Sequence, residues 1–296
     1  MNNIKWLIQS VGKNQMLEDN FETVKKLKFD YDNFSLITGK NEIINLENFL
    51  TNEEDNYILR GGTKIISLFF SGINDLEKLS NYLTENQIKN KDIFYKKLKE
   101  GIFYDEINFD QEYYNKLDLP LLNKNSVFIS IKDNKELSFD NDYFIKPSKD
   151  LKSFLPGILK AKQKIKDFIE SGSYIQDYDK EMLLVSPVEK LYNEYRFFII
   201  NKEVITYSQY RNENEVKYNS FVPKKMVDIA KEYAKLYQPH EIFTMDLVET
   251  DNGVKIVEYN CWNGSGLYHC DKIKLFKEVN DFIKNKCKVK NKNGYI

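Results

Sequence analysis

The sequence predicts a mixed α/β protein with more than one lobe, on the strength of three observations. Short apolar strand patterns alternate with helical periodicity along the first hundred residues. Pro120 ends a short helical stretch and marks a boundary between lobes. Farther along, two apolar strands joined by a turn sequence each carry one acid. At 296 residues the chain is long enough for two or three lobes.

Residues 1–115 are predicted to form a small α/β domain. Strands are expected at residues 4–9, 34–38 and 56–60, and helices at residues 75–85 and 92–100. The segment Arg60-Gly-Gly-Thr-Lys64 follows a strand, but it lacks the GxxxxGK[ST] spacing of a phosphate-binding loop and indicates a tight strand exit. A short helix is expected at residues 110–119.

Residues 116–190 are predicted to form a second lobe that is rich in short strands. Strands are expected at residues 127–131, 143–146, 173–177 and 182–185, with a helix at 159–171. A polar loop with Lys149 and Lys152 runs from Lys146 to Gly157. Lysines at a strand end and on a loop can hold and cover nucleotide phosphates. In a chain so rich in lysine, any single one is more often a solvated surface charge.

Residues 191–287 are predicted to form a third section. Strands at 195–200 and 204–211 precede a helix near 223–237, and a hairpin of strands 242–248 and 254–259 follows. A glycine-bearing loop at 261–271 leads into a last helix that ends at about residue 286. Residues 288–296 are polar and basic and are expected to form a flexible tail.

The register of the hairpin decides whether its two acids meet. A two-residue turn at residues 252–253 would set Asp246 opposite Tyr259, whereas a three-residue loop that ends in a left-handed Gly253 sets Asp246 opposite Glu258. Opposed carboxylates repel each other, so the second register requires a cation between them or a shared proton.

Asn260 is expected on the same face of the strand as Glu258, two residues away. Two carboxylates and an amide oxygen form the hard oxygen set that Mg²⁺ accepts, with nucleotide phosphates and waters as further ligands. The hairpin therefore predicts a magnesium site. The alternative is a solvated strand face that carries two acids by chance.

Three of the 44 basic residues are arginines, namely Arg60, Arg196 and Arg211. In a lysine-rich chain, arginine is expected to persist where its planar fork binds a carboxylate or phosphate in a bidentate manner. Arg196 lies within an apolar strand, where an unpaired guanidinium would be costly, so a functional role is favoured there. For Arg60 and Arg211 a solvated position is an equal alternative.

Composition excludes several classes of protein. A net charge of −1 argues against a general polyanion binder, so any contact with nucleic acid would be local. The three cysteines and two histidines show no CxxC or HxxxH spacing, which leaves structural zinc and a disulfide framework without support. The longest apolar run is too short to span a bilayer, and the N-terminal residues lack the apolar segment of a signal peptide. A soluble cytoplasmic protein is expected.

Taken together, the motifs from about residue 115 to 285 resemble the ATP-grasp superfamily. Its pattern is a strand that ends in Lys-Pro before a loop, a linker strand that leads to a glutamate, and a late aspartate followed by Glu-x-Asn. Within this span the chain is similar to a phage-associated clade described by one arginine and two lysines, through the motifs Phe144-x-Lys-Pro, Asp150-x-Lys152-x-Phe154, Glu194-Tyr-Arg-Phe-Phe, Ser208-Gln-Tyr-Arg211 and Gly266-x-Tyr268-x-x-Asp271. The resemblance implies an ATP-grasp fold with two lobes that enclose a nucleotide cleft, preceded by a small pre-ATP-grasp domain.

The resemblance also implies roles for individual residues. Lys146 is expected to contact the α- and β-phosphates of ATP, with Lys152 as the second lysine, and Glu194 is expected to bind the ribose hydroxyls. The hinge that meets adenine is expected over residues 184–190, with Leu184, Val185, Ser186 and Val188. The Mg²⁺ ligands are expected to be Asp246, Glu258 and Asn260.

For catalysis, Arg196 and Lys152 are expected to offset the charge that develops on the γ-phosphate, and Arg211 to anchor a carboxylate or an acylphosphate. The remaining candidates for substrate contact are Arg60 and four residues of the loop after the hairpin, Asn263, Ser265, Tyr268 and Asp271.

The implied reaction is the transfer of phosphate from ATP to a carboxylate, which gives an acylphosphate that an amine attacks with release of ADP and phosphate. A kinase on the same scaffold is the first alternative. Nucleotidyl transfer to nucleic acid ranks third, because the chain has no KxDG-type lysine nucleophile, and a non-catalytic nucleotide-binding protein is a fourth option. The expected partners are small-molecule or peptide carboxylates and amines, with no membrane. The expected location is the cytoplasm, that of the host if a phage encodes the chain.

Overall fold

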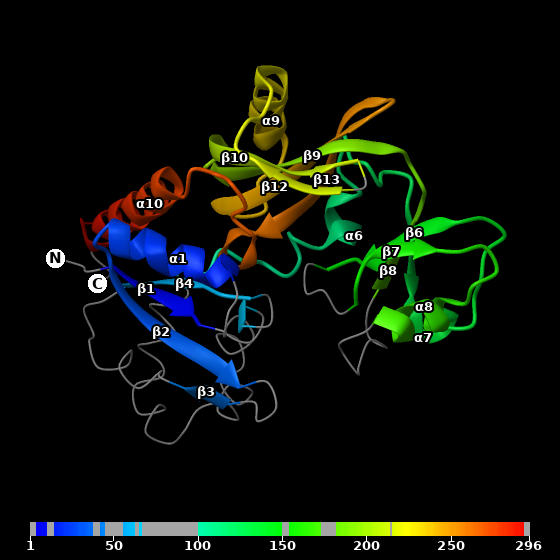
Figure 1. Ribbon diagram of the computed structural model, residues 1–296, viewed down its shortest axis with the longest axis horizontal. Helices are drawn as coiled ribbons and strands as arrows, with labels where there is room; N and C mark the ends of the chain where they lie inside the picture. Colours follow the sequence, from blue (N-terminus) through cyan, green and yellow to red (C-terminus); the bar gives the residue numbers. More distant parts are fainter. Residues whose placement is uncertain are drawn as a thin grey trace.

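The computed structural model describes residues 4–10, 15–37, 42–44, 56–62, 65–66, 100–149, 154–172, 182–213 and 215–292. Within these residues the chain forms a four-stranded N-terminal sheet, a five-stranded central sheet and a four-stranded small sheet. In Figure 1 the central sheet lies between the N-terminal sheet on the left and the small sheet on the right. The helices expected at 75–85 and 92–100, the strand expected at 173–177 and Lys152 fall outside the described residues.

The N-terminal sheet has the strand order β3-β2-β1-β4. Strand β1 (Ile4–Gln9) runs parallel to β2 (Asp30–Ile37) and β4 (Asn56–Arg60), while β3 (Glu42–Ile44) is antiparallel to β2. The expected bounds of β1 and β4 are confirmed. Strand β2 begins four residues before its expected start, because its polar first residues are held by pairing with β1. Helix α1 (Gln15–Lys26), which was not expected, connects β1 to β2.

The small sheet is antiparallel, with the order β5-β8-β6-β7. Its strands are β5 (Val127–Ser130), β6 (Tyr143–Pro147), β7 (Gly157–Leu159) and β8 (Met182–Pro187). Helix α7 (Ile131–Asn134) follows β5, and helix α8 (Ile165–Gly172) covers the apolar core. The helix expected at 159–171 therefore starts six residues late. Leu159, the expected first residue of this helix, instead ends β7, where it pairs with Tyr143 of β6 and is buried, so packing in the sheet overrides its helical pattern.

The central sheet is antiparallel, with the order β11-β10-β9-β12-β13. Its strands are β9 (Leu191–Ile200), β10 (Glu203–Asn212), β11 (Glu215–Asn219), β12 (Ile242–Thr250) and β13 (Gly253–Cys261). Strands β9 and β10 are joined at Asn201 and Lys202, which both have positive φ, as a tight hairpin turn of the right twist requires. Strand β11 was not expected: its five residues alternate polar and apolar side chains, but the run is short and largely exposed.

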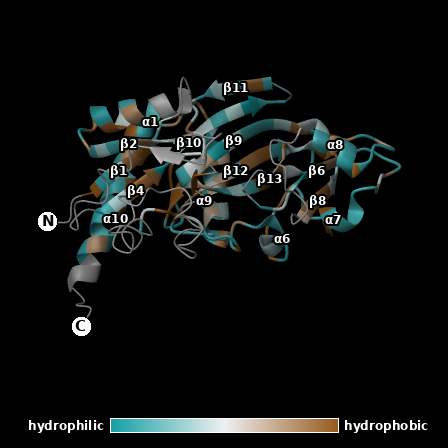
Figure 2. Cartoon of the chain, turned by 90° about the horizontal axis from the view of Figure 1, so that it is seen from below, coloured by the Kyte–Doolittle hydropathy of each residue, from teal (hydrophilic) through white to brown (hydrophobic). Residues whose placement is uncertain are grey.

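Alternation along the strands divides the central sheet into two faces. Odd-numbered β9 residues such as Tyr195 and Phe197 pack in one core with α9 (Lys224–Leu236). Even-numbered residues such as Phe198 pack on the opposite side with Trp262 and α10 (Lys272–Lys292). Strands β12 and β4 are predominantly hydrophobic in Figure 2, as expected of strands that are covered on both sides.

The hairpin of β12 and β13 pairs Asp246 with Glu258, which confirms the register that brings the two acids together. The expected three-residue loop is wrong, however. Thr250 pairs with Gly253, so only residues 251 and 252 form the loop, and Gly253 has the expected left-handed conformation, with φ of 94°.

A bulge supplies the missing residue of this register. The pairing shifts between Asp246 and Leu247, so that Leu247 pairs with Ile256 and Val257 has no partner across the hairpin. One extra residue in a strand moves every later pair by one position, and here it moves Glu258 opposite Asp246. The sequence near the turn does not reveal a bulge four residues away.

Two further helices differ from their expected bounds. Helix α6 is confined to Gln111–Tyr114 within the expected 110–119 segment. Helix α10 continues to Lys292, beyond its expected end at about 286, so part of the expected tail is helical. None of the helices in the described part of the chain is long and apolar enough to cross a membrane.

A close approach between segments explains one glycine. A Cβ at Gly101 would lie 1.7 Å from the carbonyl oxygen of Tyr57 on β4, whereas a Cβ at Gly172, in the last position of α8, would meet nothing within 4 Å. We expect Gly101→Ala to lower the free energy of unfolding by about 3 kcal/mol, because the backbone of β4 must shift. Gly172→Ala is the matched control and should leave stability almost unchanged. Urea denaturation checks both, and equal midpoints would contradict the expectation.

Candidate functional site

A single row of paired residues crosses four strands of the central sheet. Ser208 on β10 pairs with Arg196 on β9, Arg196 pairs with Asp246 on β12, and Asp246 pairs with Glu258 on β13. Because residues two positions apart share a face of a sheet, further polar side chains lie on the same face. These are Glu194, Thr244 and Asn260.

Arg196 and Asp246 form a bidentate ion pair in the middle of this row. The distances are 2.8 Å from Nε to Oδ1 and 2.7 Å from Nη2 to Oδ2, and the two side chains are only 8% and 2% exposed. Burial alone would lower the pKa of Arg196, but the Asp246 carboxylate holds that pKa above its ordinary value. The buried guanidinium therefore has the partner that its apolar strand requires.

Lys146 brings the small sheet into contact with the row. It lies on β6, and its Nζ is 2.5 Å from Oε2 of Glu258 on β13. Asn260 donates its amide N–H groups to Oε1 of Glu258 at 3.1 Å and to Oδ2 of Asp246 at 3.5 Å. The two acids thus share one amide nitrogen, which shows how close their carboxylates lie.

The donor set of this cluster fits a hard divalent cation. The described residues contain no group of three or more His, Cys, Asp or Glu side chains that could hold a metal. The expected set instead has two carboxylates, and the Asn260 amide supplies an oxygen once it turns over. Opposed carboxylates that share an amide nitrogen suit a cation such as Mg²⁺, which keeps several of its other ligands as water or phosphate. In this structure Arg196 and Lys146 balance the two negative charges.

Glu194 and Arg211 were expected at different parts of the site but are in contact. Arg211 Nε lies 3.3 Å from Oε1 of Glu194, and the hydroxyl of Tyr210 donates to Oε2 at 2.6 Å. Glu194 is 7% exposed, whereas the Arg211 side chain is 44% exposed. Burial raises the pKa of Glu194, and the Tyr210 hydrogen bond and the Arg211 charge oppose this rise without cancelling it.

The expected hinge residues lie where the chain passes from the small sheet to the central sheet. Leu184, Val185 and Ser186 are buried on β8, and Val188 is exposed between β8 and β9. Leu184 is the register partner of Lys146 on the neighbouring strand. Leu184, Val185 and Ser186 therefore lie on the strand that adjoins the strand of Lys146 in the small sheet, and Val188 follows that strand.

Two buried residues near Lys146 were missed by the sequence reasoning. Gln111, at the start of α6, is 0% exposed, and neither polar atom of its side chain has a hydrogen-bond partner among the described residues. The hydroxyl of Ser148, two residues after Lys146, is buried and likewise has no partner within this described part of the chain, and the N–H of Gln111 donates to the Ser148 carbonyl at 3.0 Å. Buried polar groups that lack partners are common where a ligand or water completes the site.

The structure argues against direct substrate contact for two of the expected residues. Arg60 is fully buried and donates to the carbonyls of Trp262 and Ser265. Asn263 is also fully buried, and its amide group bonds to the main chain of residues 59, 101 and 103. Their polar atoms serve contacts within the protein. The scarcity of arginine in the sequence correctly indicated that the planar fork of Arg60 is used, but it could not show whether the fork binds a substrate or buried main-chain carbonyls.

The other residues of the loop after β13 have mixed surroundings. Ser265 is buried and bonds to Cys261 and Thr244, and Asp271 is exposed and accepts from the N–H of Lys274 at the start of α10. Asp271 thus caps a helix.

Tyr268, by contrast, lies at the site. Its ring stacks with that of Tyr210 at 5.2 Å and with that of Tyr218 at 5.1 Å between centroids, and the Arg196 guanidinium carbon is 5.1 Å from its ring centre. The ring therefore forms an aromatic wall beside Arg196.

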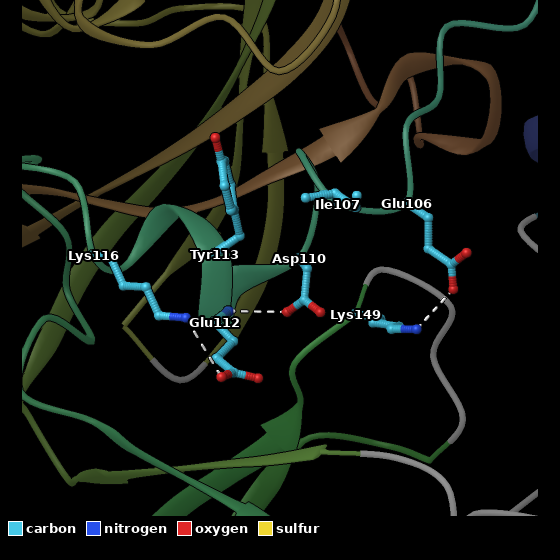
Figure 3. Close-up of a pocket in the computed structure, with 7 residues that line it drawn as sticks. All are labelled: Glu106, Ile107, Asp110, Glu112, Tyr113, Lys116 and Lys149. Carbon is cyan, nitrogen blue, oxygen red and sulfur yellow. Dashed lines mark hydrogen bonds and ion pairs between the residues drawn. The ribbon is translucent and has the colours of Figure 1, made fainter.

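A separate polar cavity of about 350 Å³ lies beside α6 (Figure 3). Figure 3 shows Lys149 directed at Glu106, and the two side chains form an ion pair at 2.7 Å. None of the residues that line this cavity belongs to the row of Arg196, Asp246 and Glu258. The candidate functional site is therefore the row of charges and not this cavity, and Lys149 belongs to the cavity.

A family model described as an ATP-grasp domain, clade family 3, matches residues 111–279, which is more than half of the chain. The chain belongs to this ATP-grasp family. The match begins at Gln111 and includes the small and central sheets with their row of charges. The expected superfamily and fold class are thereby confirmed.

Solved structures support the same fold. The protein is similar to the D-alanine–D-alanine ligase of Bacillus anthracis, with a TM-score of 0.57 and 13% identity over 99% of this chain and 100% of that chain. It is also similar to the ATP-grasp ligase PsnB complexed with precursor peptide PsnA2 and AMPPNP, with a TM-score of 0.52 and 12% identity over 96% and 99% of the two chains. A comparison with curated proteins found no match.

The raised pKa of Glu194 gives a prediction about stability. The folded state holds this proton more tightly than the unfolded state, so the ionised carboxylate lowers the free energy of unfolding. This loss begins as the pH rises above the unfolded value, near 4.3 for glutamate, and is complete above the folded pKa. Glu194→Gln imitates the protonated form. We expect the variant to match wild type in acid and to become the more stable protein as pH rises through that window, as urea denaturation at several pH values would show. A constant difference would contradict this.

Proposed function

We propose that this protein is an ATP-dependent ligase that joins a carboxylate to an amine. The observation that carries the proposal is the opposition of Asp246 and Glu258 across β12 and β13, with Lys146 reaching Glu258 from the small sheet. Two acids and a lysine from separate sheets can bring a divalent cation and a polyphosphate together. Membership of the ATP-grasp superfamily agrees with this arrangement.

ATP would lie between the small and central sheets. Lys146 would exchange Glu258 for the α- and β-phosphates, because a phosphate offers the lysine a stronger negative charge once a metal neutralises the acid. Gln111 and Ser148 have buried polar atoms that bond to none of the residues the structure describes, and they are suited to the phosphate end. Lys152 remains the proposed second lysine. Leu184, Val185, Ser186 and Val188 would meet adenine, and Glu194 would accept from the ribose hydroxyls.

Asp246, Glu258 and Asn260 would hold Mg²⁺, which supplies charge neutralisation at the phosphates when bound. The protein's own groups do the positioning. Arg196 keeps Asp246 in a fixed orientation through two hydrogen bonds, and its positive charge lies on the same face of the sheet as the acids.

The carboxylate substrate would meet Arg211 and Tyr268. Arg211 is the most exposed of the three arginines, and its planar fork can bind a carboxylate in a bidentate manner once Glu194 turns to a ribose. The carboxylate would attack the γ-phosphorus and release ADP, and an amine would then attack the acylphosphate and release phosphate. Ser265 and Asp271 are kept as proposed neighbours of the acceptor. The proposed domains are residues 1–115, 116–190 and 191–287, followed by a tail.

The decisive substitution is Glu258→Gln, which keeps the size of the side chain and removes one charge from the acid pair. We expect the variant to fold and to lose ATP turnover by about a hundredfold or more, because charge at the phosphates is no longer neutralised. The measurement is the release of ADP and phosphate with a panel of carboxylates and amines, with mass spectrometry of products. Wild-type turnover by the folded variant would contradict the metal assignment.

The same assay separates a ligase from its alternatives. A ligase needs both a carboxylate and a nucleophile and releases ADP and phosphate. A kinase leaves a stable phosphorylated product with one substrate, and nucleotidyl transfer releases AMP and pyrophosphate.

Nucleotide binding is tested at Lys146. We expect Lys146→Met to weaken the binding of Mg·ATP about tenfold or more, since one charge-assisted hydrogen bond contributes about 1.5 kcal/mol or more. Lys160→Met is the control, because Lys160 is 68% exposed and pairs with Asp142 within the small lobe. Isothermal titration calorimetry measures both affinities. Equal affinities of the two variants would exclude Lys146 from the phosphate site.

A further inference from the structure

The most unusual side chain outside the row of charges is Arg60, the last residue of β4. It is 0% exposed, and among the described residues no carboxylate pairs with it. A buried guanidinium without a carboxylate is costly unless neutral acceptors satisfy its donors. Arg60 also lies outside the matched span 111–279, so membership of the family assigns it no role.

The acceptors of Arg60 come from the loop that follows β13. Nη1 donates to the Trp262 carbonyl and Nη2 to the Ser265 carbonyl, the latter at 2.8 Å. The guanidinium carbon lies 4.4 Å from the centre of the Trp262 ring, and Nε donates to Oδ1 of Asn20 on α1 at 3.4 Å. The planar fork thus holds two carbonyls that are three residues apart with two separate nitrogens in a rigid arrangement, whereas a lysine offers a single nitrogen.

Asn263, between those two carbonyls, strengthens the attachment from the opposite direction. Its Nδ2 donates to the carbonyls of Leu59 at 2.6 Å and Gly101 at 2.8 Å, and its Oδ1 accepts from the N–H of Phe103 at 2.7 Å. Its own carbonyl accepts from the N–H of Gly61 at 3.1 Å. Residues 262–265 are therefore fixed to the N-terminal domain by two side chains, that of Arg60 on β4 and that of Asn263 in the loop itself.

The next residue of the loop connects this attachment to the row of charges. The Gly266 carbonyl accepts from Nη1 of Arg196 at 3.4 Å, and the Ser265 and Thr244 hydroxyls are 3.1 Å apart. Arg196 in turn holds both oxygens of Asp246. A continuous series of contacts thus runs from Arg60 through residues 262–266 and Arg196 to Asp246.

The charge of Arg60 is retained in this setting. Burial lowers the pKa of Arg60 to about 10, with the neighbouring charge of Arg196 as a smaller cause, so the side chain is still a cation at neutral pH.

We propose that Arg60 is a positioning residue, which fixes the loop 262–266 and, through Gly266 and Arg196, the orientation of Asp246. This inference rests on the ligase proposal for the role of Asp246. It makes the N-terminal domain part of the active enzyme, because a residue outside the ATP-grasp match determines where the loop beside the acceptor lies. The alternative is that Arg60 only stabilises the interface between the domains.

The first measurement is amide hydrogen exchange in the full chain. In Arg60→Lys the charge stays but the fork is lost, so peptides that cover residues 262–271 should exchange at least about tenfold faster. The control is Lys5→Met on β1, which removes the 2.6 Å ion pair with Asp32 in the same sheet and keeps Arg60 and Asn263, whose hydrogen bonds hold the loop. That variant should leave exchange of the loop unchanged. Asn263→Ser loosens the same attachment from the other side and replaces Arg60→Lys if that variant does not fold.

The second measurement separates positioning from stability. With Mg·ATP and water or a carboxylate–amine pair as acceptors, Arg60→Lys should lower kcat about tenfold and leave KM for ATP within about twofold, because nucleotide contacts remain while Asp246 is misoriented. Lys5→Met should retain the wild-type kcat. A purely structural role would lower the amount of folded enzyme and leave kcat per folded molecule unchanged.

Each result has one meaning for the proposal. Unchanged exchange in both loop variants overturns the claim that Arg60 holds the loop. Faster exchange with wild-type kcat and KM overturns the claim that the loop orients Asp246. Wild-type protein that neither binds nor turns over ATP overturns the ligase proposal itself, and the exchange result then shows separately whether the attachment exists.

Discussion

The direct opposition of two carboxylates on adjacent strands is the constraint on which the candidate site depends. Asp246 and Glu258 face each other across β12 and β13, where like charges repel. The protein compensates with Arg196 on one neighbouring strand and Lys146 from another sheet. These cations offset the two negative charges in this structure, and they lie where a polyphosphate would need positive charge. In this structure the two cations stabilise the fold by pairing with the acids, whereas the proposed chemistry requires Lys146 to leave Glu258 and bind phosphate.

The antiparallel central sheet makes this arrangement possible. Its period of two residues sends Tyr195, Phe197 and Met245 into the core beneath α9, and it sends the charged residues to the opposite face. The packed apolar core on the α9 side of the sheet keeps the strands in register. Arg196 and Asp246 are thereby held opposite each other, so little further side-chain entropy is lost when they form their bidentate pair. The bulge at Val257 then adjusts the register by the one residue that pairs the acids.

The N-terminal sheet is attached to the loop after β13 through hydrogen bonds between side chains and main-chain atoms. Arg60 and Asn263 join β4 to the loop after β13, and their polar groups bond almost entirely to carbonyl and N–H groups. Hydrogen bonds to main-chain atoms hold the loop in place without using its side chains. The side chains of neighbouring residues such as Tyr268 can therefore line the proposed site of the acceptor substrate. Glu194 is buried and its partner Arg211 is exposed, and a nucleotide and a carboxylate can each compete for one member of this pair.

The sequence by itself determined four of the five strands of the central sheet, the need of Arg196 for a partner, and the two acids that one of its registers would bring together, because each depends on period-two patterning or on the cost of a buried charge. It missed β7 and β11 and misplaced α8, where pairing with neighbouring strands overrides local propensity. It suggested Arg60 and Asn263 for substrate contact, because scarcity and loop position do not reveal burial. Only the tertiary structure decided the Val257 bulge, the contact of Lys146 with Glu258 and the attachment of Arg60, since each joins residues that are distant in sequence or depends on pairing geometry that no local pattern records.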